Sequence, residues 1–201
     1  MQMPWQRKVR MRAMKYFPRL MKVPIPSVRL NEADHIMLAG REWTAVHTPG
    51  HTHDHLCLFD PAEGVLLSGD HVLPEITPHI SGLTPHGDPL DLFFGSLDKI
   101  DSFADSVSIA LPAHGTPFTG VGERVRAIKE HHHQRLQKLK DTSSSLGRPA
   151  TVMEFAQHLF SPRAQGPMAD SEAYAHLEHL RIRGEMQMRD VDGAYEYVLG
   201  D

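Results

Sequence analysis

The sequence has one cysteine, no long apolar run and no acidic residue near its start. The single thiol, Cys57, cannot form a disulfide within the chain, which excludes a disulfide-stabilised secreted scaffold and is typical of a reducing compartment. No apolar run approaches the roughly 18 residues that a membrane-spanning helix needs, and no signal-peptide pattern opens the chain. We therefore expect a cytoplasmic protein that does not act at membranes.

The charge is distributed unevenly along the 201 residues. Residues 1–31 contain eight Lys and Arg and no Asp or Glu, whereas the remaining residues contain 13 basic and 25 acidic ones. An organelle transit peptide would also be rich in serine, but the first serine is Ser27. We predict a solvated basic segment over 1–24, with a phosphate-binding arm as the alternative.

The hydrophobic pattern predicts a first folded part made of short strands and two helices. Strands are expected over 35–38, 42–47, 55–59, 64–68 and 107–111, and helices over 89–102 and 123–140. Asp88 and Pro89 have the positions of an N-cap and a first helical residue. The consecutive apolar residues Val65 to Leu67 are typical of a strand that is covered on both faces.

The last third of the chain predicts a small appendage. Residues 141–149 are rich in serine, glycine and proline, which predicts a linker. Thr151 and Glu154 have capping-box spacing at the start of a short helix, and a second helix over 171–183 and a hairpin over 186–198 follow. We predict three parts: 1–24 basic, 25–141 the main domain, and 142–201 an appendage that resembles a winged helix.

Three residues with metal-ligand chemistry each follow a predicted strand. His51, Asp70 and His114 stand in loops after 42–47, 64–68 and 107–111, beside glycine residues that allow sharp turns. Neutral imidazole and carboxylate are suitable ligands for Zn²⁺, and an aspartate can bridge two ions. We therefore expect these three side chains to converge at one edge of a sheet.

Three motifs resemble the later motifs of the metallo-β-lactamase superfamily, nearest to its glyoxalase-II-like and lactamase-β-like hydrolases. They are HTPGHTHDH over 47–55, GVLLSGDHVLP over 64–74 and LPAHG over 111–115. The resemblance covers about 25–201. It implies an α/β fold (α+β by class count), namely the C-terminal half of an αββα sandwich followed by the winged-helix-like appendage.

The resemblance also implies roles for particular residues. His51 would bind one zinc, His114 a second, and Asp70 would bridge both and so take part in catalysis. A metal-bound hydroxide would be the nucleophile of the family's hydrolases. The resemblance places His55 behind the ligands or in the lining of the pocket. His71 and His79 flank the Asp70 loop in the sequence, so we also expect them to line this pocket.

One family motif is missing from the chain. The family's first metal motif, His-x-His-x-Asp-His, would lie upstream, but residues 1–34 contain no histidine. The segment 51–55 imitates it with one residue too few, so a compensating ligand cluster there is one alternative. The interpretation we favour is an N-terminally incomplete chain with weak zinc binding. We expect such a chain to expose one sheet face and to be marginally stable or to self-associate.

Three functions are compatible with these features. The first is a zinc-dependent hydrolase of a small thioester or ester, with activity impaired in this chain. The second is a phosphodiesterase or endoribonuclease on the same fold, and the third is a non-catalytic fragment. Residues 142–201 contain five basic and nine acidic residues, which disfavours a nucleic-acid partner. We therefore expect a small-molecule substrate and assign no nucleic-acid-binding residue.

The remaining histidines and the cysteine predict no further site. Three consecutive histidines, 131–133, point in successive directions around a helix and cannot all face one metal. We predict a solvated surface for them, and also for His176 and His179. Cys57 lies within a predicted strand and is interpreted as a small buried apolar residue.

Overall fold

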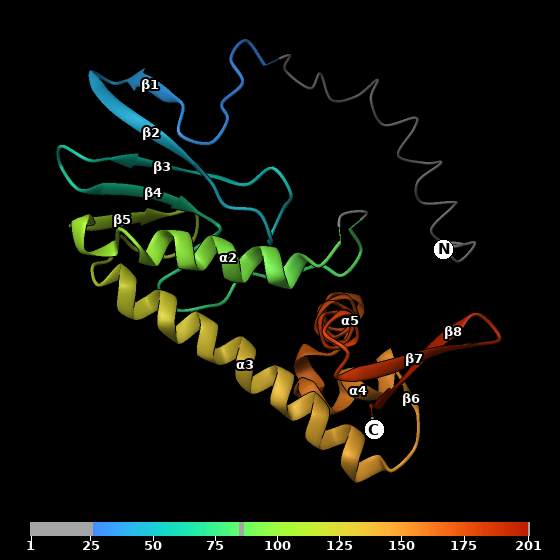
Figure 1. The fold of residues 1–201 in the computed structure, drawn as a ribbon. Coiled ribbons are helices and arrows are strands. Elements are labelled where there is room, and N and C mark those ends of the chain that lie inside the picture. Colours follow the sequence, from blue (N-terminus) through green and yellow to red (C-terminus); the bar gives the residue numbers. More distant parts are fainter. Residues whose placement is uncertain (1–25, 85–86, 201) are drawn as a thin grey trace. The chain divides into compact units, whose positions relative to one another are not determined.

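The computed structural model describes residues 26–84 and 87–200, and the chain divides into two units, 1–30 and 31–201. The basic segment predicted over 1–24 lies outside the described residues. The elements of the second unit follow one another in the order seen in Figure 1. No helix in the described ranges combines the length and apolarity that crossing a membrane requires.

The main sheet has five strands in the order β1-β2-β3-β4-β5. β1 to β4 pair antiparallel with their neighbours, and β5 pairs parallel with β4. Consequently β2, β4 and β5 all run in the same direction. The strands confirm the five predicted ones to within about two residues at each end: β1 is His35–Leu38, β2 Arg41–His47, β3 Leu56–Asp60, β4 Val65–Gly69 and β5 Ile109–Pro112.

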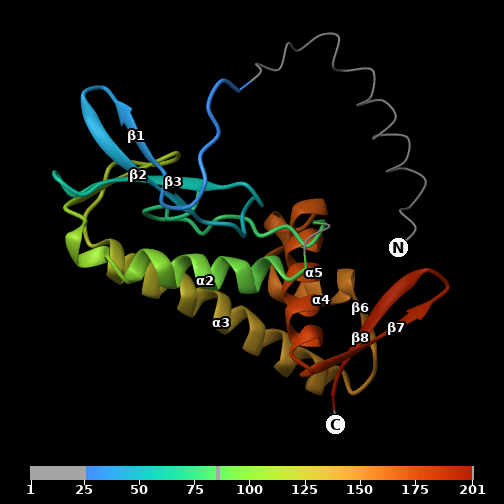
Figure 2. The ribbon, with the colours of Figure 1, turned by 45° about the horizontal axis from the view of Figure 1, so that its top comes forward.

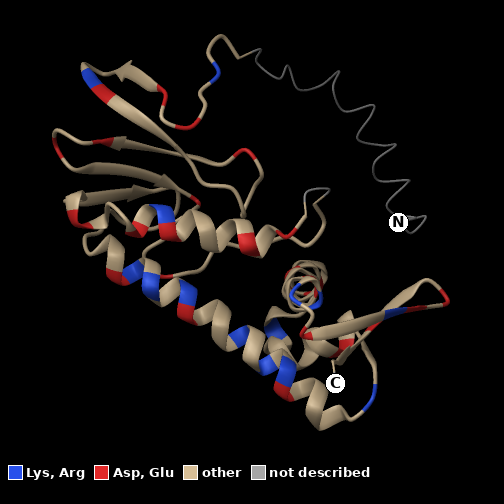
Figure 3. Cartoon of the chain, viewed as in Figure 1, with Lys and Arg blue, Asp and Glu red and all other residues tan. Residues whose placement is uncertain are grey.

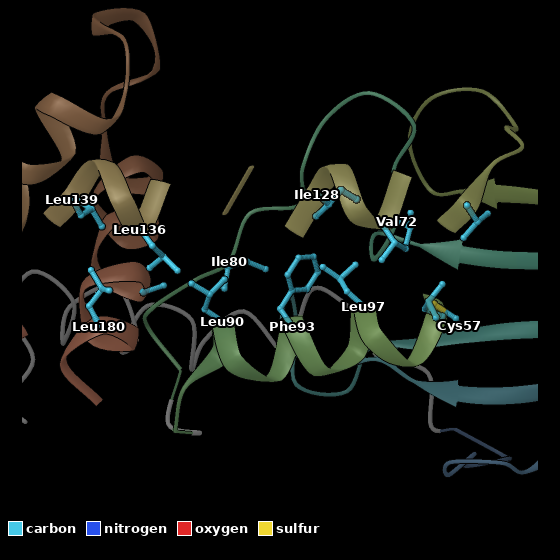
Figure 4. Close-up of a cluster of buried hydrophobic side chains, with 14 of the residues drawn as sticks. Cys57, Val72, Ile80, Leu90, Phe93, Leu97, Ile128, Leu136, Leu139 and Leu180 are labelled. Atoms are coloured by element: carbon cyan, nitrogen blue, oxygen red, sulfur yellow. The ribbon is translucent and has the colours of Figure 1, made fainter. Parts of the chain in front are cut away.

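Helices α2 (Pro89–Asp101) and α3 (Val121–Leu146) lie together on one side of this sheet (Figures 1 and 2). Asp88 is the predicted N-cap of α2, because its carboxylate accepts from two backbone N–H groups of the first turn. The apolar stripe of α2, with Leu90, Phe93 and Leu97, points into a buried core that also contains Cys57 and Ile128 (Figure 4). Leu66 of β4 belongs to the same core.

The opposite face of the sheet is only partly covered. In β4, Leu66 is fully buried toward the helices, whereas Val65 and Leu67 are half-exposed. The prediction that β4 is covered on both faces is therefore wrong, because the α2 and α3 layer packs on one face. Leu58 and Ile109 are likewise half-exposed, which agrees with the expected open face. Self-association of the chain stays a prediction.

The prediction of a linker over 141–149 is wrong for residues 141–146, because α3 continues to Leu146. Tertiary contacts stabilise the helix in this serine-rich part. The buried Ser143 hydroxyl, for example, accepts a hydrogen bond from the Leu199 backbone N–H at 2.9 Å. The helix ends at Gly147, whose φ of 60° gives the left-handed C-cap that glycine favours. Only 147–149 connect α3 to the next element.

The C-terminal region contains the predicted helices and hairpin. Thr151 and Glu154 form the predicted capping box, and β6, β8 and β7 form a three-stranded sheet in that order. The winged-helix likeness stays a prediction. The elements are β6 Ala150–Thr151, α4 Val152–Leu159, α5 Pro167–Ile182, β7 Met186–Val191 and β8 Ala194–Leu199, with short 3-10 helices at Ala104–Ser106 and Pro162–Ala164.

Helix α5 packs against the start of α2. The His179 ring donates to the Asp88 carboxylate at 2.7 Å, and both side chains are largely buried. This hydrogen bond and the two N-cap bonds hold the pKa of Asp88 below its usual value, although burial alone would raise it. The predicted surface position of His179 is therefore wrong, because it is part of the contact between α2 and α5.

Candidate metal centre

The structure brings His51, Asp70 and His114 together at one edge of the main sheet. Each residue lies in the loop that follows β2, β4 or β5. Because these strands run in the same direction, their carboxyl ends meet at the same edge. The backbone ties two of the loops directly, since the Ala113 N–H donates to the Gly69 carbonyl at 2.9 Å.

Asp70 stands between the two histidines. Its Oδ2 lies 3.9 Å from His51 Nε2, and its Oδ1 lies 3.4 Å from His114 Nε2. The side chains of His51 and Asp70 are about one-quarter and one-third exposed, at 25 % and 32 %, whereas that of His114 is 69 % exposed. A carboxylate with one oxygen toward each of two imidazoles has the arrangement of a bridging ligand.

A backbone carbonyl fixes the orientation of His51. The Nδ1–H of His51 donates to the His79 carbonyl oxygen at 2.7 Å. A carbonyl can only accept, so the proton of the neutral ring is on Nδ1 and the lone pair on Nε2 faces Asp70. Hydrogen bonds of this kind orient metal-binding histidines in proteins. His79 thus contributes through its backbone, behind His51.

His55 holds the loop that carries Asp70. The Asp70 backbone N–H donates to His55 Nε2 at 3.1 Å, so the His55 proton is on Nδ1 and is donated to Thr48 Oγ1 at 2.7 Å. Burial, and next the nearby His51, lower the pKa of His55 and keep it a neutral acceptor. A Cβ at Gly69 would lie 2.6 Å from the His55 ring, so this close approach requires glycine.

His71 lies deeper in the molecule than the pocket position predicted for it. Its side chain is fully buried. The centre of its ring lies 5.9 Å from that of His55 and 5.0 Å from that of Phe93, which it meets edge-on. Among the described residues, neither ring nitrogen makes a hydrogen bond of normal geometry. Burial lowers the pKa of His71 to about 3, so the ring is neutral at physiological pH.

Two of the predicted surface histidines belong to a second buried cluster. His132 and His176 are both completely buried and lie beside Glu172, so the surface prediction is wrong for them, whereas His133 is exposed as predicted. Helix periodicity could have found His132, because it continues the apolar stripe from Ile128 with a spacing of four. The buried position of Cys57 is confirmed, and burial raises the pKa of its thiol to about 12.

The donors at the sheet edge fit Zn²⁺ chemically. The Nε2 atoms of His51 and His114 lie on either side of the Asp70 carboxylate, and each lies within 4 Å of one of its oxygens. Nitrogen and oxygen donors of this kind bind Zn²⁺, which commonly keeps three protein ligands at catalytic sites. Each histidine lies beside a different oxygen of the one shared aspartate.

Known proteins match both the sequence and this architecture. A structure described as a beta-lactamase domain protein from Burkholderia ambifaria is 33 % identical, with a TM-score of 0.81, and the match covers 89 % of this chain and 54 % of that one. A metallo-beta-lactamase family protein from Thermus thermophilus is 31 % identical, with a TM-score of 0.77 over 88 % of this chain and 55 % of that one.

Curated sequences match over a shorter region. An “Atrochrysone carboxyl ACP thioesterase” from Emericella nidulans is 31 % identical over 81 residues, which are 40 % of this chain and 24 % of that protein. The chain thus spans about half the length of the two matching structures, and the alignment covers about a quarter of this thioesterase. The sequence profile of the metallo-beta-lactamase superfamily matches residues 1–114, more than half of the chain. The chain therefore belongs to the metallo-beta-lactamase superfamily.

Proposed function

We propose that this chain carries part of the active site of a zinc-dependent hydrolase that cleaves a small thioester or ester. The observation that supports the proposal is Asp70, whose two carboxylate oxygens face His51 and His114 at the edge of the sheet. A carboxylate shared by two histidines is better suited to hold a pair of zinc ions than to act with them as a general acid and base without metal.

The residues have distinct tasks in this proposal. His51 and Asp70 would hold one ion, and Asp70 and His114 the other. Zn²⁺ bound there supplies Lewis-acid chemistry and a nucleophile derived from water at neutral pH. The His79 carbonyl keeps His51 Nε2 turned toward Asp70, and His55 fixes the backbone of Asp70. The exposed side of His114 leaves the site accessible to a substrate.

A thioester substrate is supported by the relatives that are named as acyl-carrier-protein thioesterases. A nucleic-acid substrate is disfavoured by charge. Along α3 basic residues outnumber acidic ones, with acidic residues interspersed among them (Figure 3), but residues 142–201 carry more acidic than basic residues. A phosphodiesterase acting on RNA or DNA would need a basic surface near the site.

Removing the shared carboxylate tests the proposal. We expect Asp70→Asn to weaken Zn²⁺ binding at the sheet edge, and to reduce thioester cleavage by at least about 100-fold, because both ions lose a charged ligand. Zinc binding is measured by calorimetry, and cleavage of an acyl thioester by the thiol released. His35→Ala is the matched control, since His35 is an exposed histidine on β1. Binding and cleavage unchanged in Asp70→Asn would refute the proposal.

A milder effect is expected at His55. His55→Ala leaves all three donors in place but removes the acceptor for the Asp70 backbone N–H. We expect Zn²⁺ affinity to fall by about 10-fold, in line with the loss of other hydrogen bonds behind metal ligands. His55→Gln, which keeps an acceptor on the side chain, should recover part of the affinity. Equal affinity in both variants and the unchanged protein would contradict the role of His55.

A further inference from the structure

A second group of metal-binding side chains lies between α3 and α5, apart from the sheet-edge site. His132 of α3 and the pair Glu172 and His176 of α5 each offer one ligand atom, and the three atoms lie within 4.8 Å of one another. Glu172 and His176 are four residues apart and so share one face of α5. Both histidines are fully buried, and Glu172 is 8 % exposed.

We propose that His132, Glu172 and His176 bind a divalent transition-metal ion, with Zn²⁺ as the ion that fits best, and that this ion links α3 to α5. His132 Nδ1 and His176 Nε2 are 3.0 Å apart. Two nitrogens that share a tetrahedral zinc are separated by about 3.3 Å, from Zn–N bonds of about 2.05 Å. Two imidazoles and one carboxylate are also a ligand set that zinc uses elsewhere.

The orientation of His176 favours metal binding. Its Nδ1–H donates to the Glu172 backbone carbonyl at 2.8 Å. The lone pair of the neutral ring is therefore on Nε2, which points to His132. An imidazole whose second nitrogen donates to a backbone carbonyl is the usual arrangement of a metal-bound histidine. Burial lowers the pKa of His176 to about 4, so Nε2 is unprotonated at neutral pH.

His132 has an unsatisfied atom in the ion-free arrangement. Since His176 Nε2 accepts, His132 Nδ1 donates to it, which leaves the lone pair on His132 Nε2 buried without a hydrogen-bond partner among the described residues. When a metal binds Nδ1, the proton moves to Nε2, so the ring stays neutral, and Nε2 becomes a donor in place of an acceptor. Phe93 and Phe94 pack edge-on against this ring and fix its position.

Glu172 is already held as an anion at the site. Arg135 donates to Oε1, and His79 lies 3.3 Å from Oε2. Although burial raises the pKa of Glu172, its hydrogen bond with His79 and the charge of Arg135 bring the pKa below its usual value. A carboxylate has about four lone-pair positions, so it can accept these bonds and still bind an ion. The positive charge of Arg135 repels a metal ion bound at Glu172. A substitution that removes this charge therefore tests whether an ion binds there.

The experiment uses the full chain with His51→Ala and His114→Ala, so that the sheet-edge site is removed. Because the cluster is buried, the protein is refolded with Zn²⁺, dialysed, and analysed for bound metal, with circular dichroism as the check on folding. We expect one Zn²⁺ per chain, and a visible Co²⁺ spectrum of tetrahedral type when Co²⁺ replaces it. A folded background protein that retains no Zn²⁺ would overturn the proposal.

Further variants separate the metal site from a purely hydrogen-bonded cluster. His176→Gln in this background should weaken Zn²⁺ binding at least 10-fold, whereas His133→Ala, the exposed neighbour on α3, should leave it unchanged. Arg135→Gln should strengthen binding several-fold, because it removes the opposing charge. Should His176→Gln not fold, X-ray absorption of the zinc-loaded background protein provides the test. It should show two imidazoles on one ion, and a spectrum without them would overturn the proposal.

Discussion

Between about pH 7.5 and pH 5.5, the metal-free chain is expected to lose about 4 kcal/mol of its free energy of unfolding. The cause is a set of three fully buried histidines that are neutral in the folded state, namely His71, His132 and His176. Burial lowers their pKa values to about 3, about 2 and about 4, respectively. Neighbouring imidazoles, or for His176 the charge of Arg135, lower these pKa values further, and for His176 the hydrogen bond to the Glu172 carbonyl only partly offsets this.

The sign follows from proton binding. In the unfolded chain a histidine has a pKa near 6.5, so below this pH the unfolded state binds protons that the folded state excludes. The stabilisation is therefore complete above about pH 6.5 and is lost as the pH falls toward the folded pKa values. At about pH 5.5 each histidine lowers the free energy of unfolding by about 1.4 kcal/mol. The sum over three histidines approaches the whole free energy of unfolding of many domains.

Urea unfolding with a chelator present, repeated across this pH range, measures the effect. His71→Leu should reduce the pH dependence by about one-third, because it removes one of the three neutral groups without leaving a polar atom behind. His35→Leu is the matched control, since His35 is exposed on β1. A free energy of unfolding that stays constant from about pH 7.5 to 5.5 would show that these rings are charged or solvated in the folded state.

The sheet-edge site could be predicted because its position depends on local order in the sequence. His51, Asp70 and His114 follow the ends of β2, β4 and β5 by four, one and two residues, and the shared direction of these strands brings them together. That direction follows from the antiparallel connections over 48–55 and 61–64 between β2, β3 and β4 and from a helical crossover to β5. The Asp88 N-cap and the Thr151 capping box could be predicted for the same reason.

The buried cluster could not be predicted in this way, because it depends on which helix faces meet. Residues 131–133 cover three directions of α3; the spacing of four from Ile128 singles out His132 as the inward one, but only the packing of α5 brings Glu172 and His176 to it. The length of α3 was underestimated for a related reason. Its serine-rich end is a weak helix former by itself, and contacts such as that from Ser143 to Leu199 are made by a strand 56 residues further on. The half-exposed strand face likewise depends on what packs there, which the pattern of Val65 to Leu67 cannot reveal.

Gly50→Ala is expected to destabilise the chain by about 3–5 kcal/mol, the sum of an overpacked contact and backbone strain. Gly50 precedes His51 and has a φ of 136°, a conformation that side chains rarely adopt. An added Cβ would lie 2.5 Å from the Cβ and 2.6 Å from the Cα of Phe93. No rotamer change relieves a contact with the α2 backbone, so the loop and the helix must separate.

This separation would also disturb the site, since the loop is docked on α2 by the hydrogen bond from the Ser96 hydroxyl to the Pro49 carbonyl at 2.7 Å. Gly95→Ala on the same helix is the matched control. Gly95 is exposed with no atom near its would-be Cβ, and alanine there should stabilise α2 by about 0.5–1 kcal/mol. Urea midpoints should therefore move in opposite directions for the two variants. A Gly50→Ala protein with an unchanged midpoint would mean that the loop before His51 is not packed against Phe93, and the orientation of His51 toward Asp70 would lose its structural basis.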